Sequence, residues 1–113
     1  MSSYIDSNAL DELRILMGDE LKLLYETFLE DATAKVQQLE GVAAEQDFDK
    51  TGRLAHSLKG SSRNIGAFYL SDLCESLEKS AKIESSDNWK FLISDIKDSF
   101  ERTAAEINHS ILQ

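Results

Sequence analysis

The sequence predicts an all-α protein, an antiparallel up-down-up-down four-helix bundle with a short additional N-terminal helix. The 113-residue chain has no proline, only five glycines and 42% hydrophobic residues, a composition typical of helical domains. Apolar residues recur at spacings of three and four in five stretches. The connections between these stretches are short, and short connections force consecutive helices to run antiparallel. No segment resembles a linker, so we expect a single domain over residues 1–113.

The first two stretches differ in length. Residues 6–17 form the short leading helix, with Asp6 or Ser7 as its N-cap and Gly18 after its end. Asp19 is expected to cap the second helix, which is long and ends near residue 45.

Three further helices follow. The third is expected over residues 48–64, ending at Gly66, which suits a left-handed C-cap. The fourth starts near Ala67 and stops around residues 85–87, whose polar side chains are expected to cap the fifth. The fifth begins near Trp89 and continues to about residue 111.

Charge and cysteine content limit the possible partners and locations. The formal net charge is −9, which argues against nucleic acid as a partner because phosphate binding needs a basic surface. The single cysteine, Cys74, excludes an internal disulfide, and its leucine neighbours indicate a buried thiol. No apolar segment approaches the length of a membrane span and no signal pattern opens the chain. We therefore expect a cytoplasmic protein, with the opening Met1 and short ends indicating a free-standing one.

His56 stands out in the third helix because its surroundings on a helical wheel are unusual. The large and small apolar residues lie opposite His56, so its ring projects from the solvent face. Gly52 and Gly60 each lie about 40° from His56, Arg63 about 20° and Lys59 about 60°. Glycine costs about 1 kcal/mol relative to alanine inside a helix, so two glycines here indicate that another molecule reaches the ring. The alternative is an idle surface histidine on a helix that tolerates glycine.

A basic island surrounds this histidine. Residues 50–71 contain Lys50, Arg53, Lys59 and Arg63 and no acid, while the rest of the chain has eight bases against 21 acids. Cations near an accessible imidazole suit the capture and neutralisation of a phosphoryl group. Chance clustering of solvated charges is the simpler explanation, but the island coincides with the glycine-flanked histidine.

The run from His56 to Ala67 resembles the signature of the histidine-containing phosphotransfer (HPt) domains of multistep phosphorelays. That signature is close to His-x-Leu-Lys-Gly-Ser-Ser-x-x-Ile-Gly-Ala, and the chain matches it without a gap. The motif is short but specific, and the helical pattern extends the resemblance over nearly the entire chain. The resemblance implies that His56 is the phosphoacceptor and that Lys59 and Gly60 support it.

Glu78 is a further candidate in the fourth helix. Helical geometry places it about 80° from Leu70, at the edge of the buried stripe. Members of this family often have a glutamine or glutamate 22 residues beyond the histidine, hydrogen-bonded to its ring, and Glu78 matches that offset. Such a bond would fix the tautomer so that Nε2 is the nucleophile. A solvated glutamate on a helix flank is the equally weighted alternative.

Other kinds of site have no support in the sequence. His109, the other histidine, lies far along the chain, and no zinc-binding pattern or phosphate-binding loop is present. Ser61 and Ser62 point inward on the wheel and resemble spacers for helix packing. We expect no metal, cofactor or ATP site in this chain.

The resulting functional hypothesis is a monomeric phosphocarrier rather than an enzyme. His56 Nε2 would accept a phosphoryl group from a receiver-domain aspartate and pass it to another receiver, within a pathway headed by a hybrid sensor histidine kinase. The receiver would supply Mg²⁺, while Arg53, Arg63 and Gly52 would support docking and access. The alternatives are a helical adaptor that binds a partner through the same face, and the dimerisation helices of a histidine kinase. The kinase, the response regulator and the direction of flow are not specified by the sequence.

Overall fold

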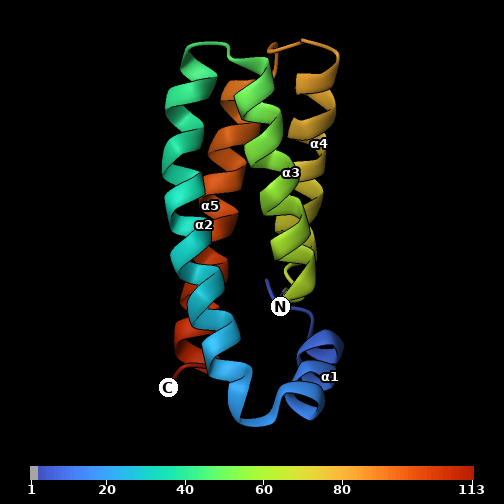
Figure 1. Ribbon diagram of the computed structural model, residues 1–113, viewed down its shortest axis with the longest axis vertical. Helices are drawn as coiled ribbons and strands as arrows, with labels where there is room; N and C mark the ends of the chain where they lie inside the picture. Colours follow the sequence, from blue (N-terminus) through green and yellow to red (C-terminus); the bar gives the residue numbers. More distant parts are fainter. Residues whose placement is uncertain (1–2) are drawn as a thin grey trace.

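The computed structural model describes residues 3–113, and this part of the chain folds into an antiparallel four-helix bundle with a short leading helix (Figure 1). The elements in chain order are α1 (Ser7–Met17), a 3₁₀ turn η1 (Gly18–Glu20), α2 (Leu21–Ala44), α3 (Phe48–Asn64), α4 (Phe68–Lys82) and α5 (Trp89–Ser110). The predicted all-α fold is confirmed. Met1, on which the expectation of a free-standing protein partly rests, lies outside the described residues.

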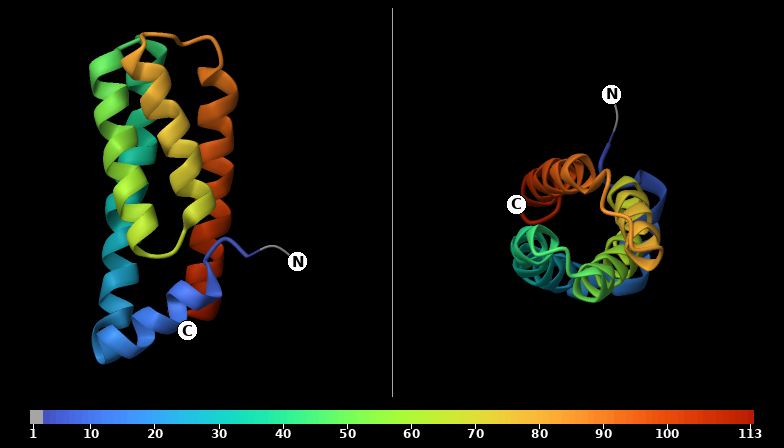
Figure 2. Two further views of the ribbon diagram at one scale, coloured as in Figure 1. Left: turned by 90° about the vertical axis from the view of Figure 1, so that its right-hand side faces the viewer. Right: turned by 90° about the horizontal axis from the view of Figure 1, so that it is seen from above.

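The four long helices surround one apolar core. Seen from above, α2, α3, α4 and α5 follow one another around the bundle in chain order, so that α5 returns beside α2 (Figure 2). Each helix turns one apolar stripe inward, as the periodicity predicts. The fully buried side chains include Tyr25 and Leu39 from α2, Leu58 from α3, Leu70 and Leu77 from α4, and Ile96 and Ile107 from α5. Within residues 3–113, no helix is long and apolar enough to cross a membrane.

Helices α3 and α4 are shorter than α2 and α5, and α1 closes the space below the turn that joins them (Figure 1). Gly66 in that turn has a φ of +86°, which favours glycine. A Cβ added there would lie 3.1 Å from the Ala9 Cβ of α1. The Gly66 carbonyl accepts a hydrogen bond from the Asp6 N–H at 2.9 Å.

The residues before α1 are also attached to α5. The Glu106 carboxylate accepts hydrogen bonds from the backbone N–H groups of Tyr4 and Ile5 at 2.9 and 3.0 Å. The leading segment is thus fastened to both α5 and the α3–α4 turn.

Two predicted helix caps and one predicted helix end are wrong. Asp19 lies within η1, and α2 begins at Leu21 after Glu20, without a side-chain cap. Helix α4 ends at Lys82, earlier than expected, because Glu84 adopts a left-handed φ of +53° that stops the helix. The N-cap residue of α5 is Asn88, not one of the predicted residues 85–87, and its side chain makes no capping bond.

Other predicted boundaries are correct. Helix α3 spans the expected residues 48–64, and its N-cap is Asp47, whose carboxylate accepts from the Lys50 N–H at 3.0 Å. Asp6 is the N-cap residue of α1, although its side chain makes no capping bond. Ser62 is buried as predicted, whereas Ser61 is only half-buried.

A buried tyrosine links α2 to the end of α3. The Tyr25 hydroxyl donates a hydrogen bond to the Ile65 carbonyl at 2.9 Å, satisfying a carbonyl that the end of the helix leaves without a helical partner. Burial raises the pKa of Tyr25 to about 12, against a smaller lowering by Arg14.

We predict that Tyr25→Phe lowers the free energy of unfolding by about 1–3 kcal/mol, because the buried Ile65 carbonyl loses its partner. Urea denaturation followed by circular dichroism measures the loss. Tyr69→Phe, at an exposed tyrosine, is the control and should change stability little. Equal stability of the two variants would contradict the assigned role of the buried hydrogen bond.

Candidate functional site

His56 lies in the middle of α3 with 68% of its side chain exposed. The buried residues of α3 are Thr51, Ala55, Leu58 and Ser62, on the opposite side of the helix. The ring therefore projects from the solvent face, as the helical wheel predicts. A ligand or partner can approach the ring without any movement of a loop.

Glu78 of α4 forms a hydrogen bond with this ring. Its Oε2 lies 2.7 Å from His56 Nδ1, and its side chain is only 8% exposed. The alternative of a solvated glutamate on a helix flank is wrong. The pairing joins α3 and α4 across 22 residues of sequence.

The charge of Glu78 determines which ring nitrogen carries the proton. The hydrogen bond from Lys59 lowers the pKa of the Glu78 carboxyl; burial acts in the opposite direction, and the bond with His56 adds to the lowering. The group is therefore an ionised carboxylate, which can only accept hydrogen bonds. His56 Nδ1 must then carry a proton and donate it, leaving Nε2 as the nitrogen with a free lone pair in the neutral ring.

Lys59 is fixed by the same carboxylate. Its ammonium lies 2.7 Å from Glu78 Oε1, and its side chain is 25% exposed. Its backbone carbonyl accepts a hydrogen bond from the Ser71 hydroxyl of α4 at 3.0 Å. Lys59 thus stands beside the ring, but part of its charge is already balanced by Glu78.

The two glycines next to His56 have different roles. A Cβ added at Gly60 would meet nothing within 4 Å, so this position leaves open space beside the ring. A Cβ added at Gly52 would lie 3.3 Å from the Ala81 Cβ of α4. The missing side chain of Gly52 therefore allows α3 and α4 to pack closely, a role that the sequence did not predict; its role in access stays a prediction.

The basic island is largely balanced in three dimensions by acids from outside residues 50–71. The Arg53 Nε lies 3.1 Å from Asp49, and Arg63 Nη2 lies 3.7 Å from Asp72. Arg63 also donates to the Ser71 hydroxyl at 3.4 Å. The sequence count missed these pairs because Asp49 directly precedes the island and Asp72 directly follows it, on α4.

A hollow of about 520 Å³ opens beside His56 between α3 and α4. It is lined by Phe48, Asp49, Gly52, Arg53 and His56 from α3, and by Glu78, Ala81, Lys82 and Glu84 from α4 and its end. Lys82 was missed by the sequence analysis. Its ammonium lies 3.8 Å from Glu78 Oε2, one helical turn away, and the i, i+4 spacing from Glu78 is the signal that could have identified it.

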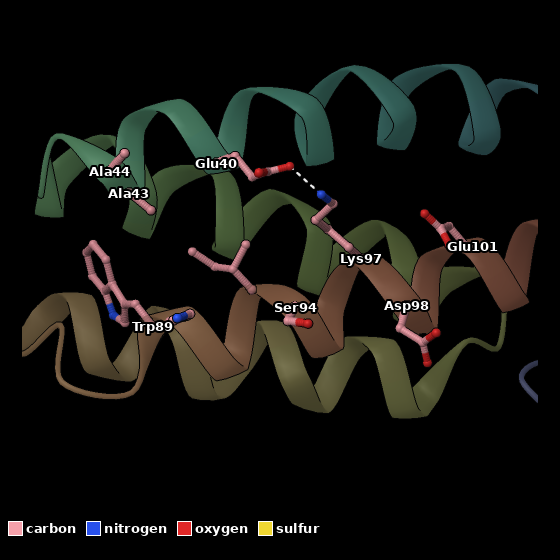
Figure 3. A pocket seen from close by; sticks show the side chains of 10 residues that line it. Glu40, Ala43, Ala44, Trp89, Ser94, Lys97, Asp98 and Glu101 are labelled. Atoms are coloured by element: carbon pink, nitrogen blue, oxygen red, sulfur yellow. Dashed lines mark hydrogen bonds and ion pairs between the residues drawn. The ribbon is translucent and has the colours of Figure 1, made fainter.

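A second hollow, of about 540 Å³, lies between α2 and α5 (Figure 3). Trp89 stands at one end near Ala43 and Ala44, and Lys97 reaches across to pair with Glu40. Neither histidine nor cysteine lines this hollow. The candidate site is therefore the hollow beside His56.

The remaining reactive side chains provide no second centre. Burial raises the pKa of the Cys74 thiol to about 12, so the thiol stays protonated. His109 is exposed near the end of α5. Within residues 3–113, no three histidine, cysteine or acidic side chains gather as metal ligands.

Comparisons with known proteins agree with this fold. The family model described as the Hpt domain matches residues 23–106. The crystal structure of histidine-containing phosphotransfer protein B (HptB) from Pseudomonas aeruginosa PAO1 is similar to this chain, with a TM-score of 0.92 and 28% identity. The match covers 96% of this chain and 95% of that one. No curated protein sequence matches the chain.

The first prediction for the site compares the two glycines. Gly60→Ala should raise the free energy of unfolding by about 0.5–1 kcal/mol, because alanine is the better helix former and the added methyl group has space. Gly52→Ala should be the less stable of the two variants, because its methyl group presses on Ala81. Thermal unfolding compares them, and equal gains would show that Gly52 is not a packing glycine.

The second prediction concerns how the stability contributed by Glu78 depends on pH. Because the pKa of Glu78 is lowered in the folded protein, the unfolded chain protonates this group first as the pH falls. Its contribution to stability is present above the ordinary glutamate value of about 4.3 and is lost as the pH drops toward the folded pKa. The stability advantage of the wild type over Glu78→Gln should therefore shrink as urea denaturations are moved from pH 6 to pH 3. A difference independent of pH would contradict an ionised Glu78.

Proposed function

Because the chain belongs to the Hpt domain family, whose members are phosphocarriers in phosphorelays, we propose that it accepts a phosphoryl group on His56 Nε2 from a receiver-domain aspartate and passes it to another receiver domain. The observation that carries this proposal is the exposed ring whose Nδ1 bonds to a buried carboxylate. That arrangement directs the free lone pair of the neutral ring to Nε2.

His56 keeps its Nδ1 proton throughout the transfer. The Nε2 lone pair forms a bond to phosphorus while the bond between phosphorus and the aspartyl oxygen breaks, and its electron pair returns to the receiver's carboxylate. The ring becomes positively charged and keeps its Nδ1 proton, which Glu78 stabilises electrostatically. In the reverse or onward step the leaving group is a neutral imidazole, so the same geometry supports transfer in both directions.

The neighbours of His56 assist by charge and by space. Lys59 provides positive charge beside the site of transfer, where phosphoryl chemistry depends on positioning and charge neutralisation. Gly60 leaves clearance for the incoming receiver. The receiver domain supplies the aspartate and Mg²⁺, so this chain needs no metal of its own. It acts as a carrier that is consumed and regenerated, not as an enzyme.

We further propose that the partners are receiver domains of response regulators and of a hybrid sensor histidine kinase, met by a monomeric protein in the cytoplasm. The net charge of −9 is unsuited to nucleic acid and to anionic membrane surfaces. Arg53 and Arg63 lie on the His56 face, where their charge would favour approach of an acidic receiver pocket, although acids pair with both.

The test is transfer of radiolabelled phosphate from phosphorylated receiver domains with Mg²⁺. The label should appear on the wild-type protein, be released by acid and survive base, as expected of a phosphoramidate. His56→Gln should fold but accept no label, since the side chain is exposed. His109→Gln, at the other exposed histidine, is the matched control and should accept label as the wild type does.

Two results would overturn the proposal. Label retained by His56→Gln would place the phosphoryl group on another residue. Stable binding of receivers without label on the wild-type protein would favour the helical adaptor instead.

A further inference from the structure

Asp49 is the acid that α3 places on the same face as His56. It lies seven residues before His56, which puts it two helical turns away, about 20° around the helix and about 10 Å along its axis. Its side chain is 71% exposed and lines the same hollow as the ring. The other charged residues of α3 are basic. A single negative charge therefore stands on a face that is otherwise positive.

A protein that reaches His56 also covers Asp49. Small protein interfaces bury about 600–800 Å² on each partner, and a patch of that area centred on the ring extends roughly 14–16 Å from it. Asp49, about 10 Å along α3, lies inside this patch but away from its centre. Its carboxylate therefore faces the border of a docked receiver rather than the phosphoryl group.

The ion pair between Asp49 and Arg53 is open to exchange. Its two contacts measure 3.1 and 3.3 Å, and within residues 3–113 the Asp49 carboxylate pairs with Arg53 alone. The Arg53 side chain is 80% exposed, and pairs exposed to this degree are weak. A basic side chain on an arriving receiver can bind the Asp49 carboxylate, whereas an acidic one meets a like charge that Arg53 only partly neutralises.

A purely structural role for Asp49 is the competing explanation, because acids in the first turn of a helix interact favourably with its dipole. The start of α3 is already capped, however, by Asp47, whose carboxylate accepts from the Lys50 N–H. An exposed ion pair between residues four apart also adds little to stability. Folding alone therefore gives little reason for a carboxylate at position 49.

We propose that Asp49 is a specificity-determining residue, which favours receiver domains with a basic side chain at the border of their phosphorylation pocket and slows those with an acidic one. This inference rests on the function proposed above. Every receiver brings an aspartate and Mg²⁺ to His56, so that contact does not distinguish one receiver from another. A charge at the border of the interface does, because like charges placed opposite each other suppress the wrong partner.

A matched control for Asp49 is Asp98 on α5. It pairs with Arg102 at 3.0 Å and at the same spacing of four residues, and its side chain is 63% exposed. It lines the hollow between α2 and α5, on the opposite side of the bundle from the contact between α3 and α4 (Figure 2). Replacing either aspartate by asparagine changes the net charge equally, so any difference between the two variants reflects position.

The experiment uses one receiver domain that labels His56 of the wild type. At each position bordering its phosphorylation pocket in turn, the receiver is made with lysine and with glutamate. The initial rate of label transfer with Mg²⁺ is measured at low ionic strength, where exposed charges are least screened. The acceptors are the wild type, Asp49→Asn, Asp49→Glu and Asp98→Asn.

The quantity compared is the rate with the lysine form divided by the rate with the glutamate form. Any change in the reactivity or folding of the acceptor cancels in this ratio, so a merely structural role for Asp49 would not move it. For the border position that meets Asp49, we expect the ratio to fall by about two- to fivefold in Asp49→Asn. Asp49→Glu, which keeps the charge, should retain the wild-type ratio, and Asp98→Asn should do so at every position.

The outcomes separate the two proposals. If the wild type takes no label on His56 from any receiver, the proposed function fails and Asp49 has nothing to select. If the wild type is labelled but the ratios of Asp49→Asn match those of Asp98→Asn at every border position, only the inference about Asp49 is overturned. An equal acceleration of Asp49→Asn with the lysine and glutamate forms would also overturn it, because that result shows general repulsion without selection.

Discussion

At the contact between α3 and α4, a methyl group added to Gly52 would lie 3.3 Å from Ala81, and the whole site depends on this close approach. The Ser71 hydroxyl fastens the other end of the contact through the Lys59 carbonyl at 3.0 Å. Between these two points Glu78 reaches His56 Nδ1. A wider separation, or a slip of one residue that turns α4 by about 100°, would leave the ring unsupported.

A carboxylate at this depth is costly unless charged and hydrogen-bonding partners surround it. Glu78 has three partners, His56, Lys59 and Lys82. The interactions with Lys59 and His56 outweigh burial and lower the pKa of Glu78. By contrast, the exposed pair of Arg102 and Asp98 on α5 adds little to stability. The charged interactions that support the site are therefore concentrated where α3 meets α4, while the bundle as a whole is built around an apolar core.

Sequence reasoning succeeded where the physics is local and periodic. The helices, the outward direction of His56 and the left-handed Gly66 follow from spacing and residue type. It failed where the outcome depends on contacts between helices. Gly52 is a packing glycine only because Ala81 lies opposite it, and the acids that balance Arg53 and Arg63 lie outside the run that was counted. The left-handed Glu84, which ends α4 early, has no marker in the sequence because non-glycine residues seldom adopt that conformation.

The ring of His56 is held by side chains that project from helices rather than from loops. Fixing an imidazole in one orientation and one tautomer has an entropic cost, and here that cost is met once, when the chain folds. An arriving molecule finds the nitrogen already aligned and needs no reordering of this protein on each encounter. Such preorganisation lets a brief and weakly bound encounter be productive. Fast exchange of partners therefore does not require tight binding.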